Sequence, residues 1–415
     1  NFEKSKKNKL NKSSYAQASF WMAQILNEKG EFKKSINAFD EYFDLSNGLE
    51  NLPDESSPNV GHYAQGYNYL ELKDYKNAEK SFKNAIVGFN IKRNSIKNND
   101  LLNKVLPDAL VRTGDCLFKS NQYQDAMVFY EQAIAKKQGS FVYAMYQKAM
   151  IEGLLGEPYE KVLTLLDIKK DHPTSEYADD ALLQLGDTYF ELENVDNAYS
   201  SFTELVTNYK NSPLKNAAYL KLGLIAYNKG DMTSAIKQYK SIFDNNPSSK
   251  EAESAMLSLQ EIYINDLGQS DEYIAYVGTL PGYSLTGMAA DSLAYMVGDL
   301  RYNDGEYDKA ILGFDNYLTK YPNGANRIKA HYYRAESNTI LKKYSAALED
   351  YEKLVKLGVS EYYLQALKKA ALISYNHTQS FDKAYKYYDL YYTNTKDEAE
   401  KYQAILGALR SGFRV

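Results

Sequence analysis

The hydrophobic pattern of residues 291–322 predicts two helices joined by a tight turn. Small and apolar residues recur every three or four positions on both sides of the sequence Asn-Asp-Gly at 303–305, which is the spacing of one helical face. Gly298 and Ala310 are small where the two helices must approach closely, and Pro322 ends the second helix. The segment is therefore predicted to form an αα-hairpin, which cannot bury such an apolar face alone.

The same spacing recurs along the chain, so that neighbouring hairpins can cover one another. Pairs of small residues twelve positions apart are each followed, four positions later, by an aromatic residue. The pairs are Gly66 with Ala78, Gly114 with Ala126, Gly186 with Ala198, Gly223 with Ala235, Gly298 with Ala310 and Ala335 with Ala347, and the aromatic residues are Phe82, Tyr130, Phe202, Tyr239, Phe314 and Tyr351. The step between copies is 37 residues from Ala198 to Ala235 and again from Ala310 to Ala347.

This combination resembles the tetratricopeptide repeat (TPR), which has a small residue in its first helix, a small residue in its second helix and an aromatic residue one turn later. The resemblance implies an all-α, right-handed solenoid, or superhelix, of about ten helix-turn-helix repeats, and we expect it to be truncated at its C-terminal end. In such a solenoid each hairpin packs mainly on its two neighbours.

The repeat divides the chain into segments. The expected segments are a basic lead-in at 1–14, TPR repeats at 15–135 with two insertions at 44–60 and 91–107, regular repeats at 136–256, an irregular repeat at 257–290, regular repeats at 291–403 and part of a first helix at 404–415. The second insertion is either an extension of the preceding second helix or an extra turn packed beneath it. The interval from Ala235 to Ala310 is 75 residues, one more than two steps. The irregular repeat within it, whose second helix ends early at Pro281, is expected to introduce a kink or a change of curvature.

Composition and charge exclude several classes of function. The net charge of the 415 residues is −5 and Lys and Arg are scattered, so no basic patch is available for DNA or RNA. No run of about 18 apolar residues is present, so we expect no transmembrane segment in this fragment. The chain opens on Asn1 rather than a methionine, which leaves open a membrane tether through an absent N-terminus.

The chemically reactive residue types favour no catalytic, cofactor-binding or metal site. The four histidines lie in different repeats with no second ligand three or four positions away; they are His62, His172, His331 and His377. The glycine-containing segment 278–287 has no Lys-Ser or Lys-Thr pair to hold a phosphate. Cys116 and Trp21 are expected in the core. We therefore expect no cofactor and no enzymatic activity.

The first helices of a TPR stack line the inside of the superhelix, so their residues that are not used in packing are expected to form a concave groove. These candidate partner-binding residues are Tyr63, Tyr67, Asp115, Phe118, Asp187, Phe190, Tyr227, Tyr295, Asp299, Tyr302 and Tyr332. The aromatic members either pack on the adjacent hairpin or bind a peptide or a partner helix. Asp115, Asp187 and Asp299 hold the same position in three repeats, and their charge would repel a carboxylate of a partner. The co-chaperone TPRs that clamp an acidic C-terminus have Lys and Asn on this face instead.

The joints between the later repeats place turn formers before a helix rich in alanine. Ser212 is predicted to cap a helix whose first residue is Pro213. Ser248 and Glu251 have the spacing of a capping box. These signals predict where the first helices of the repeats begin.

Such joints, among them HPTSEYADDA from His172 and YPNGANRIKA from Tyr321, resemble those of the long tandem-TPR envelope proteins of Bacteroidetes. The segment YADDALLQLGDTYF at 177–190 extends the resemblance. It implies a non-catalytic protein-protein interaction scaffold of the bacterial periplasm or outer membrane, which binds partner proteins on its concave groove. The alternatives are a glycan-binding outer-membrane lipoprotein and a cytoplasmic regulatory TPR protein.

Overall fold

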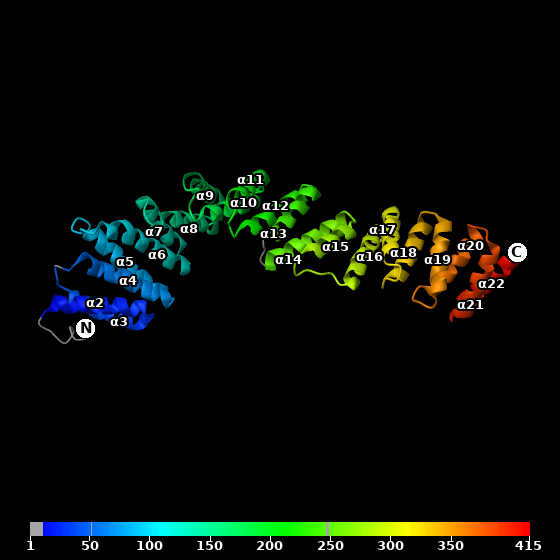
Figure 1. Ribbon diagram of the computed structural model, residues 1–415, viewed down its shortest axis with the longest axis horizontal. Helices are drawn as coiled ribbons and strands as arrows, with labels where there is room; N and C mark the ends of the chain where they lie inside the picture. Colours follow the sequence, from blue (N-terminus) through cyan, green and yellow to red (C-terminus); the bar gives the residue numbers. More distant parts are fainter. Residues whose placement is uncertain (1–10, 51, 246–248) are drawn as a thin grey trace. The chain divides into compact units, whose positions relative to one another are not determined.

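A computed structural model describes residues 11–50, 52–245 and 249–415. These residues hold 21 α-helices and three short 3-10 or π-helical segments, with no β-strand among them. The chain forms two compact units, Asn1–Ile225 and Ala226–Val415, here termed the first unit and the second unit. Each unit is a series of helix pairs joined by short turns (Figure 1), which confirms the predicted all-α repeat fold.

The first unit contains five complete hairpins, each made of a first helix and a second helix. The pairs are α2 (Lys12–Glu28) with α3 (Phe32–Ser46), α4 (Pro58–Glu71) with α5 (Tyr75–Ile91), α6 (Leu106–Lys119) with α7 (Tyr123–Lys136), α8 (Phe141–Leu154) with α9 (Pro158–Asp171), and α10 (Ala178–Glu191) with α11 (Val195–Asn208). The next first helix, α12 (Lys215–Asn228), contains the boundary between the units.

The second unit continues the same alternation after the second helix α13 (Met232–Asp244). Its complete hairpins are α14 (Ser249–Gln260) with α15 (Ser270–Thr279), α16 (Gly287–Asn303) with α17 (Tyr307–Lys320), α18 (Arg327–Ile340) with α19 (Tyr344–Leu357), and α20 (Tyr363–Asn376) with α21 (Phe381–Asn394). The final helix, α22 (Glu398–Gly412), packs on α21.

The small residues of the repeat let an aromatic ring close each hairpin. Phe314 of α17 is fully buried, and a Cβ atom built on Gly298 of α16 would lie 2.5 Å from its Cδ1 atom. Gly186 meets Phe202 in the same way, at 2.3 Å from Cε1. A side chain at either glycine would force the two helices apart, because protein interiors have no free volume to absorb it.

Two sequence predictions about single residues have opposite outcomes. Cys116 is buried in α6, where burial raises the pKa of its thiol to about 12, so its assignment to the core is confirmed. Trp21 is 43% exposed, so its assignment to the core is wrong. The preceding residue, Phe20, takes the buried position of α2, and the Trp21 ring packs edge-on against it with 5.2 Å between the ring centroids.

The start of α12 differs from its prediction. The helix begins at Lys215, and Ser212 Oγ accepts a hydrogen bond from the backbone N–H of Leu214 at 3.0 Å. Ser212 therefore stabilises the turn before the helix and does not cap a helix that starts at Pro213. The predicted capping box at Ser248 lies outside the described residues.

The two insertions of the first unit contact each other. Asp54, in the short 3-10 helix η1 (Asp54–Ser56), accepts hydrogen bonds from the backbone N–H groups of Lys97 at 2.7 Å and Asn98 at 3.0 Å. The Asn98 side chain donates to Glu55 at 2.9 Å. The insertions therefore form one substructure beside the second repeat.

The second insertion differs from both predicted alternatives. The preceding second helix, α5, ends at Ile91. Leu101–Val105 form a π-helix, η2, that continues directly into α6, and Leu101 is buried. The apolar half of the insertion therefore lengthens the first helix of the third repeat at its N-terminal end.

The irregular repeat contains another π-helical segment. Its first helix, α14, continues into the π-helix η3 (Glu261–Asp266), and its second helix, α15, ends early at Thr279 as the sequence predicts. A π-helical turn holds one residue more than an α-helical turn. The interval from Ala235 to Ala310 also contains the short α15 and the non-helical residues 280–286 that follow it. The kink or change of curvature stays a prediction.

A histidine that packs against an aromatic ring makes the first unit sensitive to acid. His62 of α4 stacks on Phe43 of α3 with 4.0 Å between the ring centroids, and burial lowers the pKa of His62 to about 4. The pKa of a histidine in an unfolded chain is about 6.5. Below that pH the unfolded state binds a proton that the folded state does not, so the free energy of unfolding should fall by roughly 2 kcal/mol between pH 7 and pH 5.

Urea unfolding at pH 7 and pH 5 measures this loss. The variant His62→Phe keeps a flat ring against Phe43 and removes the titrating group, so it should lose less stability over the same interval. Equal losses for the two proteins would show that His62 does not cause the acid sensitivity.

Candidate functional site

Within each unit the first helices form one face and the second helices form the other. Successive first helices contact each other where α2 meets α4, α6 meets α8, α16 meets α18 and α20 meets α22. In the part of the chain that the structure describes, successive second helices lie further apart. The stack therefore curves with its first helices inside, and the exposed inner face of each unit is here called its groove.

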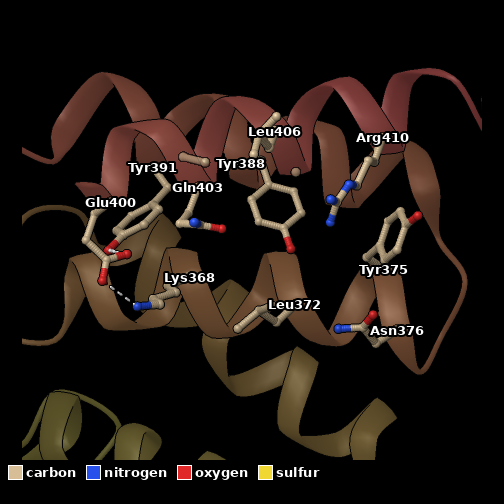
Figure 2. A pocket seen from close by; sticks show the side chains of 12 residues that line it. Lys368, Leu372, Tyr375, Asn376, Tyr388, Tyr391, Glu400, Gln403, Leu406 and Arg410 are labelled. Atoms are coloured by element: carbon tan, nitrogen blue, oxygen red, sulfur yellow. Dashed lines mark hydrogen bonds and ion pairs between the residues drawn. The ribbon is translucent and has the colours of Figure 1, made fainter. Parts of the chain in front are cut away.

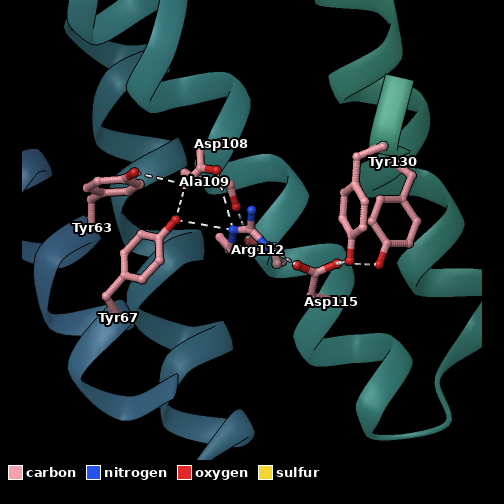
Figure 3. Close-up of polar contacts among 9 residues, drawn as sticks. Tyr63, Tyr67, Asp108, Ala109, Arg112, Asp115 and Tyr130 are labelled. Carbon is pink, nitrogen blue, oxygen red and sulfur yellow. Dashed lines mark hydrogen bonds and ion pairs between the residues drawn. The ribbon is translucent and has the colours of Figure 1, made fainter. Parts of the chain in front are cut away.

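A chain of polar contacts crosses the groove of the first unit (Figure 3). Tyr63 of α4 donates a hydrogen bond to Asp108 Oδ2 of α6 at 2.8 Å, and Tyr67 donates to the same carboxylate. Arg112 Nε of α6 donates to Tyr67 Oη at 3.1 Å and to Asp108 Oδ1 at 3.3 Å. Two predicted groove residues, Tyr63 and Tyr67, therefore join the second hairpin to the third.

Asp115 is the centre of the same chain of contacts. Its carboxylate accepts hydrogen bonds from Arg112 Nη1 at 2.5 Å, from Tyr130 of α7 at 2.7 Å and from Tyr143 of α8 at 3.0 Å. Burial raises the pKa of Asp115 above its ordinary value, while these donors favour the charged form. Asp115 therefore joins three helices, and its oxygens are occupied by groups of the protein itself.

The other two acidic groove residues also have partners within the fold. Asp187 of α10 forms an ion pair with Lys221 of α12 at 2.8 Å. Asp299 of α16 accepts a hydrogen bond from Tyr295 at 2.8 Å. Lys221 offsets the charge of Asp187, whereas a tyrosine hydroxyl leaves the charge of Asp299 uncompensated. The three acids that share a repeat position are therefore not electrostatically equivalent.

Three further predicted groove residues lie half-buried toward the ends of first helices. Phe118 packs against Tyr123 of its own hairpin with 5.5 Å between the ring centroids. The Phe190 ring lies 6.0 Å from Nζ of Lys221. Tyr227 of α12 is also half-buried. Each of the two phenylalanines therefore uses part of its ring within the fold.

Tyrosines of successive repeats meet in the groove of the second unit. Tyr332 of α18 stacks on Tyr362, which precedes α20, with 4.2 Å between the ring centroids. Tyr302 of α16 and Tyr333 of α18 are 4.8 Å apart by the same measure. All four rings are half-buried. The predicted residues Tyr302 and Tyr332 thus pack between hairpins with part of each ring still accessible.

The groove of the first unit contains a pocket of about 260 Å³. Tyr130, the aromatic residue of its repeat, forms part of the wall. Other wall residues come from three first helices, and include Leu70 of α4, Phe118 and Lys119 of α6, and Gln147 of α8. The pocket therefore combines apolar surface with the side-chain amide of Gln147 and the exposed ammonium group of Lys119.

The groove of the second unit contains a pocket of about 290 Å³ enclosed by α20, α21 and α22, here called the α20–α22 pocket (Figure 2). Tyr388 of α21 lines it and holds the same repeat position as Tyr130 in the first unit. At one end Lys368 pairs with Glu400 at 2.7 Å, and at the other Arg410 extends from α22. Both units therefore place a pocket beside the aromatic residue of a repeat.

Comparison with known families identifies the repeat. Three family models, each described as a tetratricopeptide repeat, match the chain at residues 61–86, 108–136, 183–250 and 291–324. The chain contains tetratricopeptide repeats. The matched segments include five of the six hairpins in which a small pair and an aromatic residue recur, all but the hairpin of Ala335 and Ala347.

Several solved structures are similar to this TPR protein in fold. A tetratricopeptide repeat protein from Parabacteroides merdae has 16% identity and a TM-score of 0.38, over 68% of this chain and 98% of that chain. YrrB, described as a TPR protein with an unusual peptide-binding site, has 20% identity and a TM-score of 0.38, over 52% and 96%. PilW, a type IV pilus biogenesis factor, has 16% identity and a TM-score of 0.40, over 58% and 98%. No curated protein matches the sequence.

The histidines of the TPR protein pack within the fold. His331 Nδ1 lies 2.8 Å from Asp350 Oδ1, and His377 stacks on Tyr344 with 3.6 Å between the ring centroids. Within residues 11–50, 52–245 and 249–415 there is no group of three or more acidic, histidine or cysteine side chains that could hold a metal ion. None of the helices described is both long and apolar enough to cross a membrane.

Sequence reasoning missed the α20–α22 pocket, whose walls include one departure from the repeat. Leu372 of α20 stands twelve positions before Ala384, where other repeats have a small residue. Gly407 of α22 holds the repeat position of Ala370, one step earlier, and of Tyr333, two steps earlier. A Cβ atom on Gly407 would lie 2.6 Å from the Tyr388 ring, so a larger residue there would displace Tyr388. An alignment of the repeats in register would have shown that Leu372 replaces a small residue.

Proposed function

We propose that this protein is a non-catalytic scaffold that binds partner proteins along the grooves of its two units. The observation that carries the proposal is the recurrence of a pocket beside the repeat aromatic, at Tyr130 in one unit and at Tyr388 in the other. Pockets of this kind accept individual side chains of an extended peptide or of a partner helix. The tyrosines around them supply contact area and hydroxyl groups at low cost in conformational entropy.

The polar contacts of the first unit support the proposal because they fix the groove before a partner arrives. Asp115 and Arg112 hold α4, α6, α7 and α8 through direct hydrogen bonds. A binding surface that is already ordered loses less entropy on association than a flexible one. The residues that face a partner are then the exposed parts of the pocket walls, such as Phe118 and Leu372.

We propose the bacterial periplasm or outer membrane as the place of action, on the resemblance of the repeat joints to those of envelope TPR proteins. The first thirty residues encoded by the full-length gene test this directly. A signal peptide would support export, and a lipobox cysteine would support a membrane-tethered lipoprotein. The absence of both, together with recovery of the protein in the cytoplasmic fraction, would overturn the proposed location.

Affinity purification from crosslinked cells tests the scaffold function. The wild-type protein should recover at least one partner protein in stoichiometric amount. The variant Phe118→Asp, Leu372→Asp places a charge in both groove pockets and should lose that partner. The matched control Leu312→Asp changes a leucine of α17 that is 63% exposed and lies outside both pockets, and it should retain the partner. Recovery of no protein partner, with retention of the protein on a polysaccharide column, would contradict the proposal.

A further inference from the structure

The α20–α22 pocket holds a cation, Arg410, that forms no ion pair with an acid of the described residues. In Figure 2 the guanidinium group of Arg410 points into the pocket between Tyr388 and Tyr375. Among residues 249–415, no carboxylate pairs with Arg410. The other cation of the pocket, Lys368, is neutralised by Glu400 at 2.7 Å. The Arg410 end of the pocket is therefore positively charged.

Three other arginines on first helices have acidic partners. Arg112 of α6 pairs with Asp115, Arg301 of α16 pairs with Glu306 at 3.2 Å, and Arg334 of α18 pairs with Asp350 at 2.6 Å. A guanidinium group offers a planar fork of N–H donors that matches a carboxylate. Arg410 presents this fork of donors to the pocket, and no carboxylate of residues 249–415 pairs with it there.

The other groups near Arg410 suit a carboxylate carried on a short apolar stem. Asn376 of α20 brings amide N–H donors to the Arg410 end of the pocket, and Tyr388 brings a hydroxyl group. Leu372 and the ring of Tyr375 supply apolar wall for methylene groups. One uncompensated positive charge matches a carboxylate, which carries one negative charge, better than a phosphoryl group, which carries nearly two.

We propose that the α20–α22 pocket binds the carboxylate of a glutamate or aspartate side chain that lies within a segment of the partner protein. The inference rests on the proposed function, because it names the chemistry of one contact in the groove. Arg410 supplies the ion pair, Asn376 donates to a carboxylate oxygen, and Leu372 packs against the stem of the side chain.

Selection from an array of capped peptides tests the inference. Both ends of each peptide are blocked, so that only side chains can supply a carboxylate. The full chain should select peptides that share an acidic residue at one position, and Glu→Gln at that position should weaken binding about 10- to 100-fold, as expected for loss of a charged hydrogen bond. Arg410→Gln should weaken binding of the acidic peptide to the same degree and leave the Gln peptide unaffected.

Two further variants separate recognition from folding. Arg410→Glu should reverse the preference, so that peptides with lysine at the selected position now bind best; a loss of fold could not produce this result. Arg327→Gln removes an arginine of α18 that lies outside the pocket and should leave the selection unchanged. Circular dichroism confirms that each variant is folded.

The outcomes distinguish the inference from the function on which it rests. Selected peptides without an acidic preference would overturn the inference and leave the groove as a protein-binding surface. A failure of the wild-type protein to select any peptide would count against both. Binding that requires a free C-terminus, or Arg410-dependent retention on an acidic polysaccharide without peptide binding, would assign the pocket to another ligand and overturn the inference.

Discussion

Replacing Gly313 by alanine is expected to destabilise the second unit by about 2–4 kcal/mol, as overpacking against backbone does when no flexible side chain can move away. Gly313 lies in α17 where this helix crosses α16. A Cβ atom built on it would lie 2.7 Å from the Cα atom of Gly298 and 2.8 Å from its backbone nitrogen. The added methyl group would therefore push the two helices apart and loosen the contact of Phe314 with Gly298. Urea unfolding followed by circular dichroism measures the loss.

A matched glycine controls for the substitution itself. Gly278 is also helical, in α15, and a Cβ atom on it would meet nothing within 4 Å. Gly278→Ala should therefore leave stability unchanged or raise it by up to about 1 kcal/mol, because alanine is the better helix former. If Gly313→Ala proves as stable as Gly278→Ala, the close crossing of α16 and α17 is incorrect.

Removing the carboxylate of Asp350 is expected to cost about 3–5 kcal/mol, the usual result of leaving one member of a buried ion pair without its partner. Asp350 of α19 is 2% exposed and accepts hydrogen bonds from Arg334 Nε at 2.8 Å and Nη2 at 2.6 Å. Although burial opposes ionisation, the hydrogen bonds from His331 and Arg334 hold the pKa of Asp350 below its ordinary value. In Asp350→Ala the guanidinium group of Arg334 keeps only Asp315, which is half exposed to solvent.

The double variant Arg334→Met, Asp350→Leu separates lost packing from an unpaired charge. Both charges are then absent and the volume is largely kept, so the protein should recover much of the stability lost in Asp350→Ala. The free energy of unfolding is measured by chemical unfolding for the wild-type protein, the single variant and the double variant. A double variant that is less stable than Asp350→Ala would show that the ion pair itself supplies net stability.

These two residues show which parts of the fold can be read from the sequence. Gly313 and Asp350 hold the same repeat position, three residues after the small alanine of the second helix, yet one is a glycine at a close crossing and the other a buried acid. The repeated positions predict the hairpins because every repeat needs the same small pair and ring. At a position that varies between repeats, the residue's role depends on which helix packs against it. The pattern within one repeat does not describe that contact.

Local departures from α-helical geometry were also beyond the pattern. The π-helices at Leu101–Val105 and Glu261–Asp266 adjoin regular helices, and neither segment contains a Gly or Pro. The only sign of irregularity in the sequence was the interval from Ala235 to Ala310, which is one residue longer than two repeat steps. Trp21 was misplaced because the pattern did not distinguish it from its neighbour Phe20, which faces the core instead.

The candidate site was predicted in outline only. The groove residues of the first helices were assigned by register and stay a prediction, but whether Asp115 is free or held by Tyr130 and Tyr143 depends on contacts between hairpins. The α20–α22 pocket was missed because its walls depend on contacts among three helices and on Leu372, which stands where other repeats have a small residue.

Photo-crosslinking in living cells tests the central claim, that the grooves bind protein. A photoreactive phenylalanine analogue is placed in the groove pockets at Phe118 or Leu372, and at Leu312 or Val128 on second helices, which are 63% and 51% exposed. The account predicts discrete adducts with the same partner protein from the two groove positions and none from the two second-helix positions. Adducts from Leu312 and Val128 with none from Phe118 and Leu372 would contradict it.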